Sequence, residues 1–266
     1  MALSTHSKFI YGLEVTKDNM FIEWREGLTL FQEAIPPGYY SPTTLIREIY
    51  KKMNFLSSNL YDITYDPATM LFTITSSGTF DLLTNSGDYA LSGIYSMLGL
   101  NVATDYLGVT SITGINSSAK VYKTQFYLQD YVESRMHSKH FDAVVNKSTA
   151  NITEFVGFGK NQTIEFTLQY ITNRQGHGMS FNDCLRDNVT GVEDALEFLE
   201  WAIVKGHFDF YPDENDDTDF KPIINETTGT GSNGTEFILV EETGKNLPEY
   251  FKTNKLTFGV LKYVSD

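Results

Sequence analysis

The 266-residue chain contains few cysteines and few cations: a single cysteine, Cys184, and 20 Lys and Arg residues against 34 Asp and Glu residues. One cysteine excludes an internal disulfide and any cysteine-rich zinc site. The formal net charge of −14 argues against general affinity for nucleic acids, because that affinity rests on cationic groups that displace counterions from phosphates. We therefore expect neither a disulfide-stabilised scaffold nor a general DNA-binding protein.

Long apolar runs are also missing from the chain. No stretch of about 18 apolar residues exists, and the first residues lack the charged-then-apolar layout of a signal peptide. We therefore expect synthesis in the cytoplasm and no membrane insertion. Aromatic residues, in contrast, are plentiful: 19 Phe and 16 Tyr are spread along the chain, and 20% of residues are charged. This composition is typical of a folded protein, and the length favours two modest domains.

The N-terminal stretch is predicted to begin with strands. Apolar segments at residues 9–15 and 20–24 flank an Asp-Asn pair that tolerates turn conformations, which predicts a hairpin. A third strand is expected at residues 28–35, ahead of a Pro-Pro-Gly sequence. These strands are assigned to an N-terminal helix-on-sheet module over residues 1–120.

A helix and a second hairpin complete this predicted module. Ser41 as N-cap and Pro42 at the first helical position precede apolar residues at helical spacing, which predicts an amphipathic helix. Alternation on both sides of an Asp-Pro turn predicts a hairpin over residues 61–75. Residues 80–83 continue the sheet, and residues 92–99 form a short helical turn that ends at glycine.

Residues 121–266 are predicted to form a C-terminal β-sandwich flanked by one helix. The helix is expected over residues 191–205, where Thr190 and Glu193 suit a capping box and Gly206 follows the last turn. The fold class is therefore mainly β (α+β). The expected strands cover residues 124–132, 143–145, 152–158, 163–171, 207–211, 236–240 and 255–263.

Candidate chemistry is weak along the whole chain. The acidic loop at residues 213–219 places oxygen ligands at alternate positions, but it lacks the central glycine and the bidentate Glu of a complete calcium loop. We interpret it as a solvated surface loop. His137 and His140 have the i, i+3 spacing of metal ligands without an identifiable carboxylate partner. No residue is assigned to catalysis, to a cofactor or to a metal, and we do not expect an enzyme.

Three segments carry a resemblance: PGYYSPTTLIREI at residues 37–49, YDITYDPATMLFTI at 61–74, and SGIYSMLGL at 92–100. Together they resemble a module of structural proteins of double-stranded DNA viruses and phages, a small helix-on-sheet unit without a catalytic group. The second half resembles the distal tail and tail-tube-like proteins of tailed bacteriophages in its order of strand, helix, aromatic strand and closing strand.

The resemblance implies a non-enzymatic virion protein, made in the host cytoplasm and located in the tail. Copies would form a homo-oligomeric ring, commonly sixfold, in contact with neighbouring tail, baseplate or tube proteins. DNA would pass through this ring without being bound, along a wall lined by the acidic residues. The extra N-terminal module and the lack of an obvious arm favour a distal-tail, baseplate or adaptor ring over the tube itself. Edge strands such as residues 255–263 would pair with neighbouring copies.

Two alternatives stay open at the level of the sequence. The first is a host-surface carbohydrate-binding module, in which exposed tyrosines and Trp24 stack on sugars. The second is a hydrolase hidden among the 34 acidic residues, for which loss of turnover in an Asp217→Asn variant would be the sign.

Overall fold

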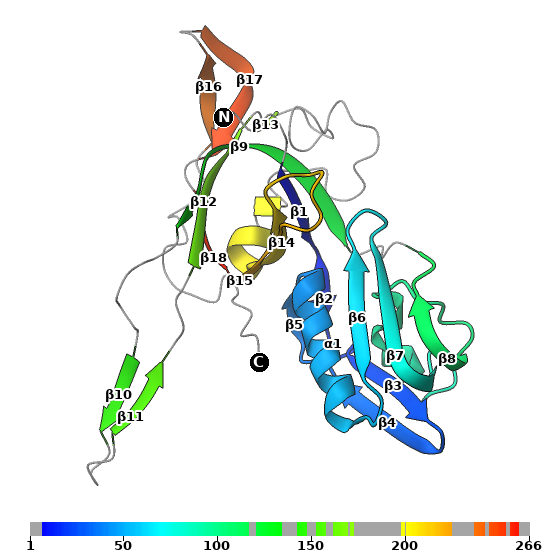
Figure 1. Ribbon diagram of the computed structural model, residues 1–266. Helices are drawn as coiled ribbons and strands as arrows, with labels where there is room; N and C mark the ends of the chain where they lie inside the picture. The colour runs from blue at the N-terminus through cyan, green and yellow to red at the C-terminus, as the bar shows by residue number, and fades with distance from the viewer. Residues whose placement is uncertain are drawn as a thin grey trace.

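The computed structural model describes residues 7–116, 121–134, 143–147, 153–157, 162–169, 171–172, 198–199, 201–224, 237–242, 245–253 and 256–260. Within these residues the chain is mostly β-strand, arranged in several antiparallel sheets with one long α-helix, as the mainly-β prediction expected. Most of the strands gather in two regions, an N-terminal module and a barrel, while the β10–β11 hairpin and the β16–β17 strands extend away from both (Figure 1). No helix in the described part of the chain has the length and apolar character needed to cross a membrane.

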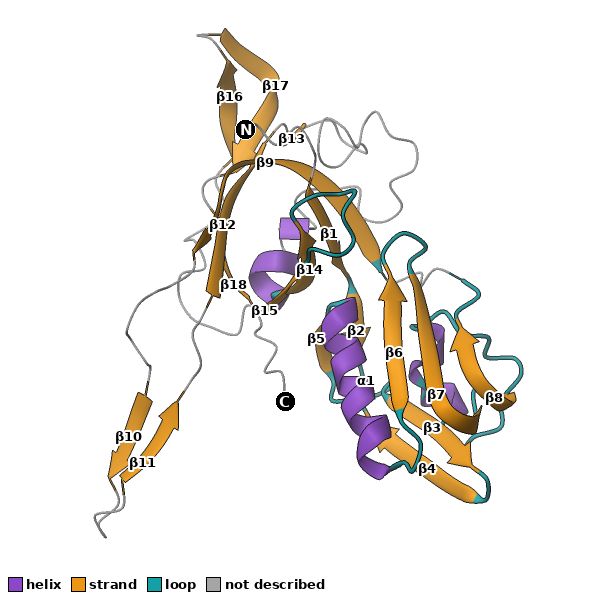
Figure 2. Cartoon of the chain, viewed as in Figure 1, coloured by secondary structure: helices purple, strands orange, loops and turns teal. Residues whose placement is uncertain are grey.

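The N-terminal module is an antiparallel sheet with α1 packed on one face (Figure 2). The sheet has the order β4-β3-β7-β6, and β8 also pairs with β7, while β2 and β5 form a separate pair. Its elements are β2 (Leu13–Val15), β3 (Phe21–Glu26), β4 (Thr29–Ala34), β5 (Gly38–Tyr40), α1 (Pro42–Leu56), β6 (Tyr61–Asp66), β7 (Leu71–Leu82), the 3-10 turns η1 (Ala90–Ser92) and η2 (Ile94–Ser96), and β8 (Tyr106–Thr113).

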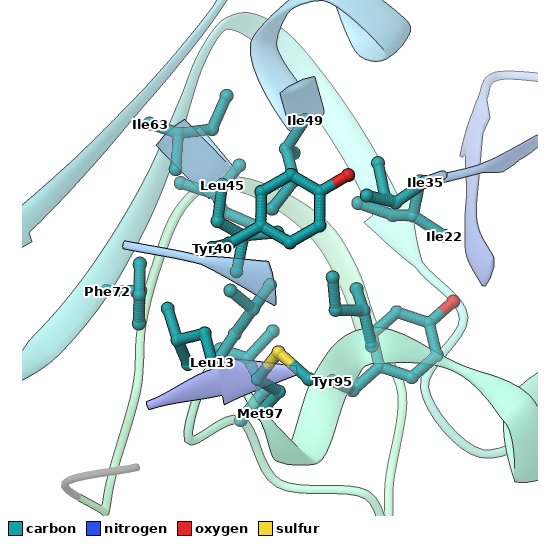
Figure 3. Close-up of a cluster of buried hydrophobic side chains, with 14 of the residues drawn as sticks. Leu13, Ile22, Ile35, Tyr40, Leu45, Ile49, Ile63, Phe72, Tyr95 and Met97 are labelled. Carbon is teal, nitrogen blue, oxygen red and sulfur yellow. The ribbon is translucent and has the colours of Figure 1, made fainter. Parts of the chain in front are cut away.

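Local signals in the sequence explain α1 and the β6–β7 hairpin, and both predictions are confirmed. Ser41 caps α1 through a reciprocal capping box: the Thr44 amide donates to Ser41 Oγ at 3.2 Å, and the Ser41 amide donates to Thr44 Oγ1 at 2.8 Å. In the hairpin turn, Asp66 accepts from the Ala68 amide at 3.0 Å. The buried side of α1 faces the sheet through Leu45 and Ile49, which lie in the module core with residues from β2, β3, β6 and β7 (Figure 3).

The predicted first hairpin is wrong. Both segments are strands, and Asn19 Oδ1 accepts from the Thr16 amide at 2.6 Å in the turn between them. However, β2 pairs with β5, whereas β3 pairs with β4 and β7. The turn chemistry is local, but the choice of partner depends on which strand buries which side chain: Leu13 and Val15 of β2 are both in the module core.

The second half forms a closed antiparallel barrel, and the β-sandwich prediction is wrong. The strand order is β1-β14-β15-β18-β12-β9, and β9 pairs back to β1. Because β18 pairs with both β12 and β15, residues 256–260 are an interior strand, not an edge open to a neighbouring copy. The barrel strands are β1 (Ser7–Tyr11), β9 (Tyr122–Ser134), β12 (Gln162–Gln169), β14 (His207–Tyr211), β15 (Lys221–Ile224) and β18 (Leu256–Val260).

Strand β1 connects the two regions. The predicted N-terminal module covers residues 1–120, but β1, at the start of that range, pairs with strands of the barrel. It comes from the N-terminal segment, yet it closes the barrel between β14 and β9. Its side chains alternate: Phe9 and Tyr11 lie in the barrel core, whereas Ile10 lies in the module core. One short strand is thus shared by both cores, which ties the module to the barrel.

The barrel interior is largely aromatic. Phe9 lies 4.8 Å from Phe198 between ring centroids, and Phe208 meets Phe258 edge-on at 5.1 Å. Such tilted and edge-to-face pairs are the favoured aromatic geometries. Five phenylalanines of the second half therefore fill the barrel: Phe166, Phe198, Phe208, Phe210 and Phe258.

The remaining described elements lie outside the barrel path. β10 (Ala143–Lys147) and β11 (Thr153–Gly157) form a hairpin, and β13 (Ile171–Thr172), β17 (Lys245–Thr253) and β16 (Phe237–Glu242) form a three-stranded sheet. Of the helix expected over residues 191–205, Phe198 and Leu199 are helical and a π-helical turn, η4 (Trp201–Lys205), follows; residues 191–197 and 200 lie outside the described residues. Gly206, at φ 70°, ends this turn as predicted.

Candidate functional site

The acidic loop at residues 213–219 connects β14 to β15 and folds around a buried lysine. The Lys8 side chain is 2% exposed; its Nζ pairs with Asp217 Oδ1 and donates to the Glu214 carbonyl oxygen at 3.2 Å. The same ammonium lies 4.5 Å from the centroid of the Tyr211 ring. Asp217, the residue suggested above for a test of hydrolase activity, thus neutralises the buried ammonium of Lys8 on β1.

Two other carboxylates of this loop, Asp213 and Asp216, accept hydrogen bonds within the loop, whereas Asp219 pairs with Lys221 of β15. Asp216 Oδ1 accepts from the Thr218 amide at 2.8 Å and from its hydroxyl at 2.6 Å, and Asp213 Oδ1 accepts from the Asn215 amide at 2.9 Å. Among the described residues, no group of three His, Cys, Asp or Glu side chains gathers as a metal site requires.

Asp209 is a buried carboxylate at the junction between barrel and module. It lies on β14, on the strand face opposite Phe208 and Phe210, and is 1% exposed. Its Oδ2 accepts from the Thr43 amide at 3.0 Å and from the Thr43 hydroxyl at 2.7 Å, at the N-terminus of α1. Its Oδ1 and the buried hydroxyl of Tyr65 have no hydrogen-bond partner in the structure as described. Burial raises the pKa of Asp209 to about 6, although hydrogen bonding by Thr43 and by the Ser41 side chain opposes the rise.

A pocket of about 470 Å³ opens on the sheet face opposite α1. Trp24 of β3 points toward α1, where its Nε1 donates to Ser57 Oγ at 3.0 Å, so the preceding Glu23 points the other way, into the pocket. Glu23 is 1% exposed; its Oε1 accepts from Gln32 Nε2 at 3.0 Å and its Oε2 from the Tyr89 amide at 3.2 Å. The wall beside it needs glycine, because a Cβ on Gly87 would lie 2.3 Å from Glu23 Oε2.

Acidic groups prevail among the charged side chains of this pocket. Asp88 and Asp105 line it with Glu23, and the one cation, Arg25, is paired with Asp81 (Nη2 to Oδ2, 2.6 Å). Partial burial acts to raise the pKa of Asp105, but hydrogen bonds from the Ser86 side chain and from the amides of residues 85 and 86 lower it overall. Asp105 therefore contributes a negative charge to the pocket at neutral pH.

The rim of the pocket is built from leucines that are open to solvent. Leu28 is fully exposed at the β3–β4 turn, next to Gly27 at φ 58°, while Leu107 and Leu30 are 62% and 47% exposed. These three leucines make an apolar rim around the acidic centre formed by Glu23, Asp88 and Asp105. We call this site the leucine-rimmed pocket.

A second exposed apolar surface lies on the outer side of α1. The buried stripe of the helix contains Leu45, Ile49 and Met53, so residues at helical spacing on the far side face solvent. Phe55 is 85% exposed and Tyr50 47% exposed. We define the α1 outer face by four residues at that spacing: Arg47, Tyr50, Lys51 and Phe55.

The residues singled out from the sequence do not meet in one site. His137, His140 and Cys184 lie outside the described residues. Trp24 is 0% exposed and stacks on Phe31 with centroids 5.2 Å apart, so the prediction that it stacks on sugars is wrong. Lys8 and Asp209 were not identified from the sequence as buried charged residues. The pattern that could have indicated them is a charged residue within a strand rich in aromatic residues.

No family model matches the sequence, and no curated protein matches it. The resemblance to phage structural proteins therefore stays a prediction, and the function is inferred from the residues and their arrangement.

Proposed function

We propose that this chain is a non-enzymatic structural protein of a tailed bacteriophage, and that its copies form a ring, commonly sixfold in the proteins it resembles, in the tail or baseplate around the DNA channel. The three segments that carry the resemblance support the proposal, because they occupy one unit. They correspond to β5 with α1, to the β6–β7 hairpin and to the η1–η2 turns, and side chains from all three share the module core.

The observation that carries the assembly part of the proposal is the amount of large apolar surface left open on this module. Single exposed hydrophobic residues are ordinary, but clusters of them mark interaction sites. Leu28 and Phe55 are 101% and 85% exposed, although the same module has a well-filled core. Further side chains of this kind are Leu60 at 72%, Leu91 at 103%, Leu107 at 62% and Ile115 at 64%. Contacts with other copies would remove them from water.

The net charge of −14 acquires a role in such a ring. A wall of like charge along an axial channel would let DNA slide without sticking. The proposal therefore expects acidic side chains to be concentrated on the face that lines the channel. A neutral or basic channel wall would contradict this part of it.

The test combines the purified protein with the particle. Mass photometry over a range of protein concentrations measures the oligomeric state, and cryo-EM of virions shows whether the chain forms an axial ring. We expect a closed oligomer in solution or in the particle. A protein that stays monomeric at every concentration and is absent from any virion would refute the proposal.

A further inference from the structure

We propose that the α1 outer face of one copy docks into the leucine-rimmed pocket of the next copy, so that a repeating contact joins successive subunits. This inference rests on the proposed function, since it specifies the interface of that ring. It assigns a partner, a second copy of this chain, to two surfaces that the fold leaves open.

Charge complementarity favours a second copy as the occupant. The carboxylates of Glu23, Asp88 and Asp105 line the pocket; Glu23 is buried at its base, whereas Asp88 is exposed and can meet a cation of a partner. Three of the six Lys and Arg residues between residues 7 and 116 lie on α1, where Lys51 pairs with Glu48 and Lys52 with Glu33. Arg47, on the α1 outer face, has no ion pair with any residue that the structure describes, which leaves its guanidinium available for a carboxylate across the contact.

The apolar parts of the two surfaces also match. The α1 outer face presents Phe55 and Tyr50, aromatic side chains of the kind that anchor protein interfaces. The pocket presents Leu28 and Leu107 around a cavity of about 470 Å³. With an aromatic side chain of α1 between the leucines and Arg47 beside Asp88, the contact would bury apolar groups that the isolated chain exposes.

The placement of the two surfaces makes the contact head-to-tail. α1 covers one face of the module sheet, and the pocket opens on the other, as the opposite orientations of Trp24 and Glu23 require. Each copy therefore has one surface of each kind on opposite sides. A contact of this type cannot be satisfied by a two-fold pair, and it produces a ring when the rotation closes.

Charge reversal on either side provides the test, with the full chain and self-association measured by analytical ultracentrifugation. We expect Asp88→Lys and Arg47→Glu each to weaken association by about tenfold or more, because each places like charges across the contact. Asp18→Lys, at an exposed turn outside both surfaces, is the matched control and should associate like the wild type. Circular dichroism checks that every variant is folded.

Restoration distinguishes this interface from a general loss of solubility. A 1:1 mixture of Asp88→Lys with Arg47→Glu should assemble, because Arg47 of the first meets Asp88 of the second and the two substituted residues attract each other. The double variant should assemble for the same reason. Folded single variants that associate like the wild type, or a mixture that fails to assemble, would overturn the inference. If the wild type forms rings while the single variants do so equally well, this interface is wrong and the proposed function stands; a monomeric wild type that is absent from virions refutes both.

Discussion

Replacing Asp209 by asparagine is expected to stabilise the protein at neutral pH. The carboxylate is buried between β14 and α1, where Thr43 donates two hydrogen bonds to one oxygen and the other oxygen has no described partner. The positive end of the α1 dipole and the Thr43 hydrogen bonds stabilise the ionised carboxylate. The free-energy cost of removing this charge from water is larger than both effects. Asparagine keeps an acceptor for Thr43 and removes the charge.

The pKa gives the size of the effect. A carboxyl that titrates at about 6 in the folded protein and at 3.8 in the unfolded chain lowers the stability by about 3 kcal/mol when both states are ionised. The sign follows from proton binding. As the pH falls through 6, the folded protein binds a proton that the unfolded chain does not, so stability from this group rises until about pH 4. Above about pH 6 the carboxyl is ionised in both the folded and the unfolded state, so this gain in stability is absent.

Urea unfolding of wild type and Asp209→Asn at pH 7 and pH 5 measures this directly. We expect the variant to be more stable by up to about 3 kcal/mol at pH 7, and by roughly half as much at pH 5. Other titrating groups cancel in the difference between the two proteins. Asp62→Asn, at an exposed position of β6, controls for the substitution itself. An equal difference at both pH values, or a variant that is less stable at pH 7, would refute the reasoning.

Three further substitutions test the fold. Ser41→Ala removes the capping box of α1 and should lower the free energy of unfolding by about 1 kcal/mol, measured by urea denaturation; an unchanged midpoint would show that the cap adds nothing. Gly87→Ala forces a Cβ to within 2.3 Å of Glu23 Oε2 and should cost about 1–3 kcal/mol in the same assay; wild-type stability would mean that this wall yields freely. Asp217→Ala leaves the ammonium of Lys8 buried without its carboxylate and should lower the melting temperature by several degrees, about 1–3 kcal/mol. A Lys8→Met variant that unfolds more easily than Asp217→Ala would contradict that account, since methionine leaves no charge to pair.

Much of the N-terminal module was predictable because its signals are local. The Ser41-Pro42 start of α1 and the Asp-Pro turn between β6 and β7 act on residues a few positions away. Strand pairing is different in kind. The segment at residues 13–15 reads as a strand from its alternation, but whether it pairs with β3 or with β5 depends on cores assembled from distant residues.

The candidate site was not predictable from any motif. Glu23 belongs to β3, Asp88 to the segment after β7, and Leu107 to β8, so the pocket exists only when these segments meet. Helical spacing places Phe55 outside the buried stripe of α1, but only the fold shows that no other described element covers it and that it is 85% exposed.

The sequence by itself determined the mainly-β class, the position of α1, most of the strands and the acidic charge, because composition, periodicity and caps are properties of short segments. Only the tertiary structure decided that the second half closes as a barrel, that Ser7–Tyr11 completes it, and that Lys8 and Asp209 are buried. The physical reason is that barrel closure pairs strands about 200 positions apart, such as Lys8 with Tyr211. Such a pairing is stabilised by the burial of side chains that are far apart in the sequence. No local sequence pattern shows that these side chains lie close together in the fold.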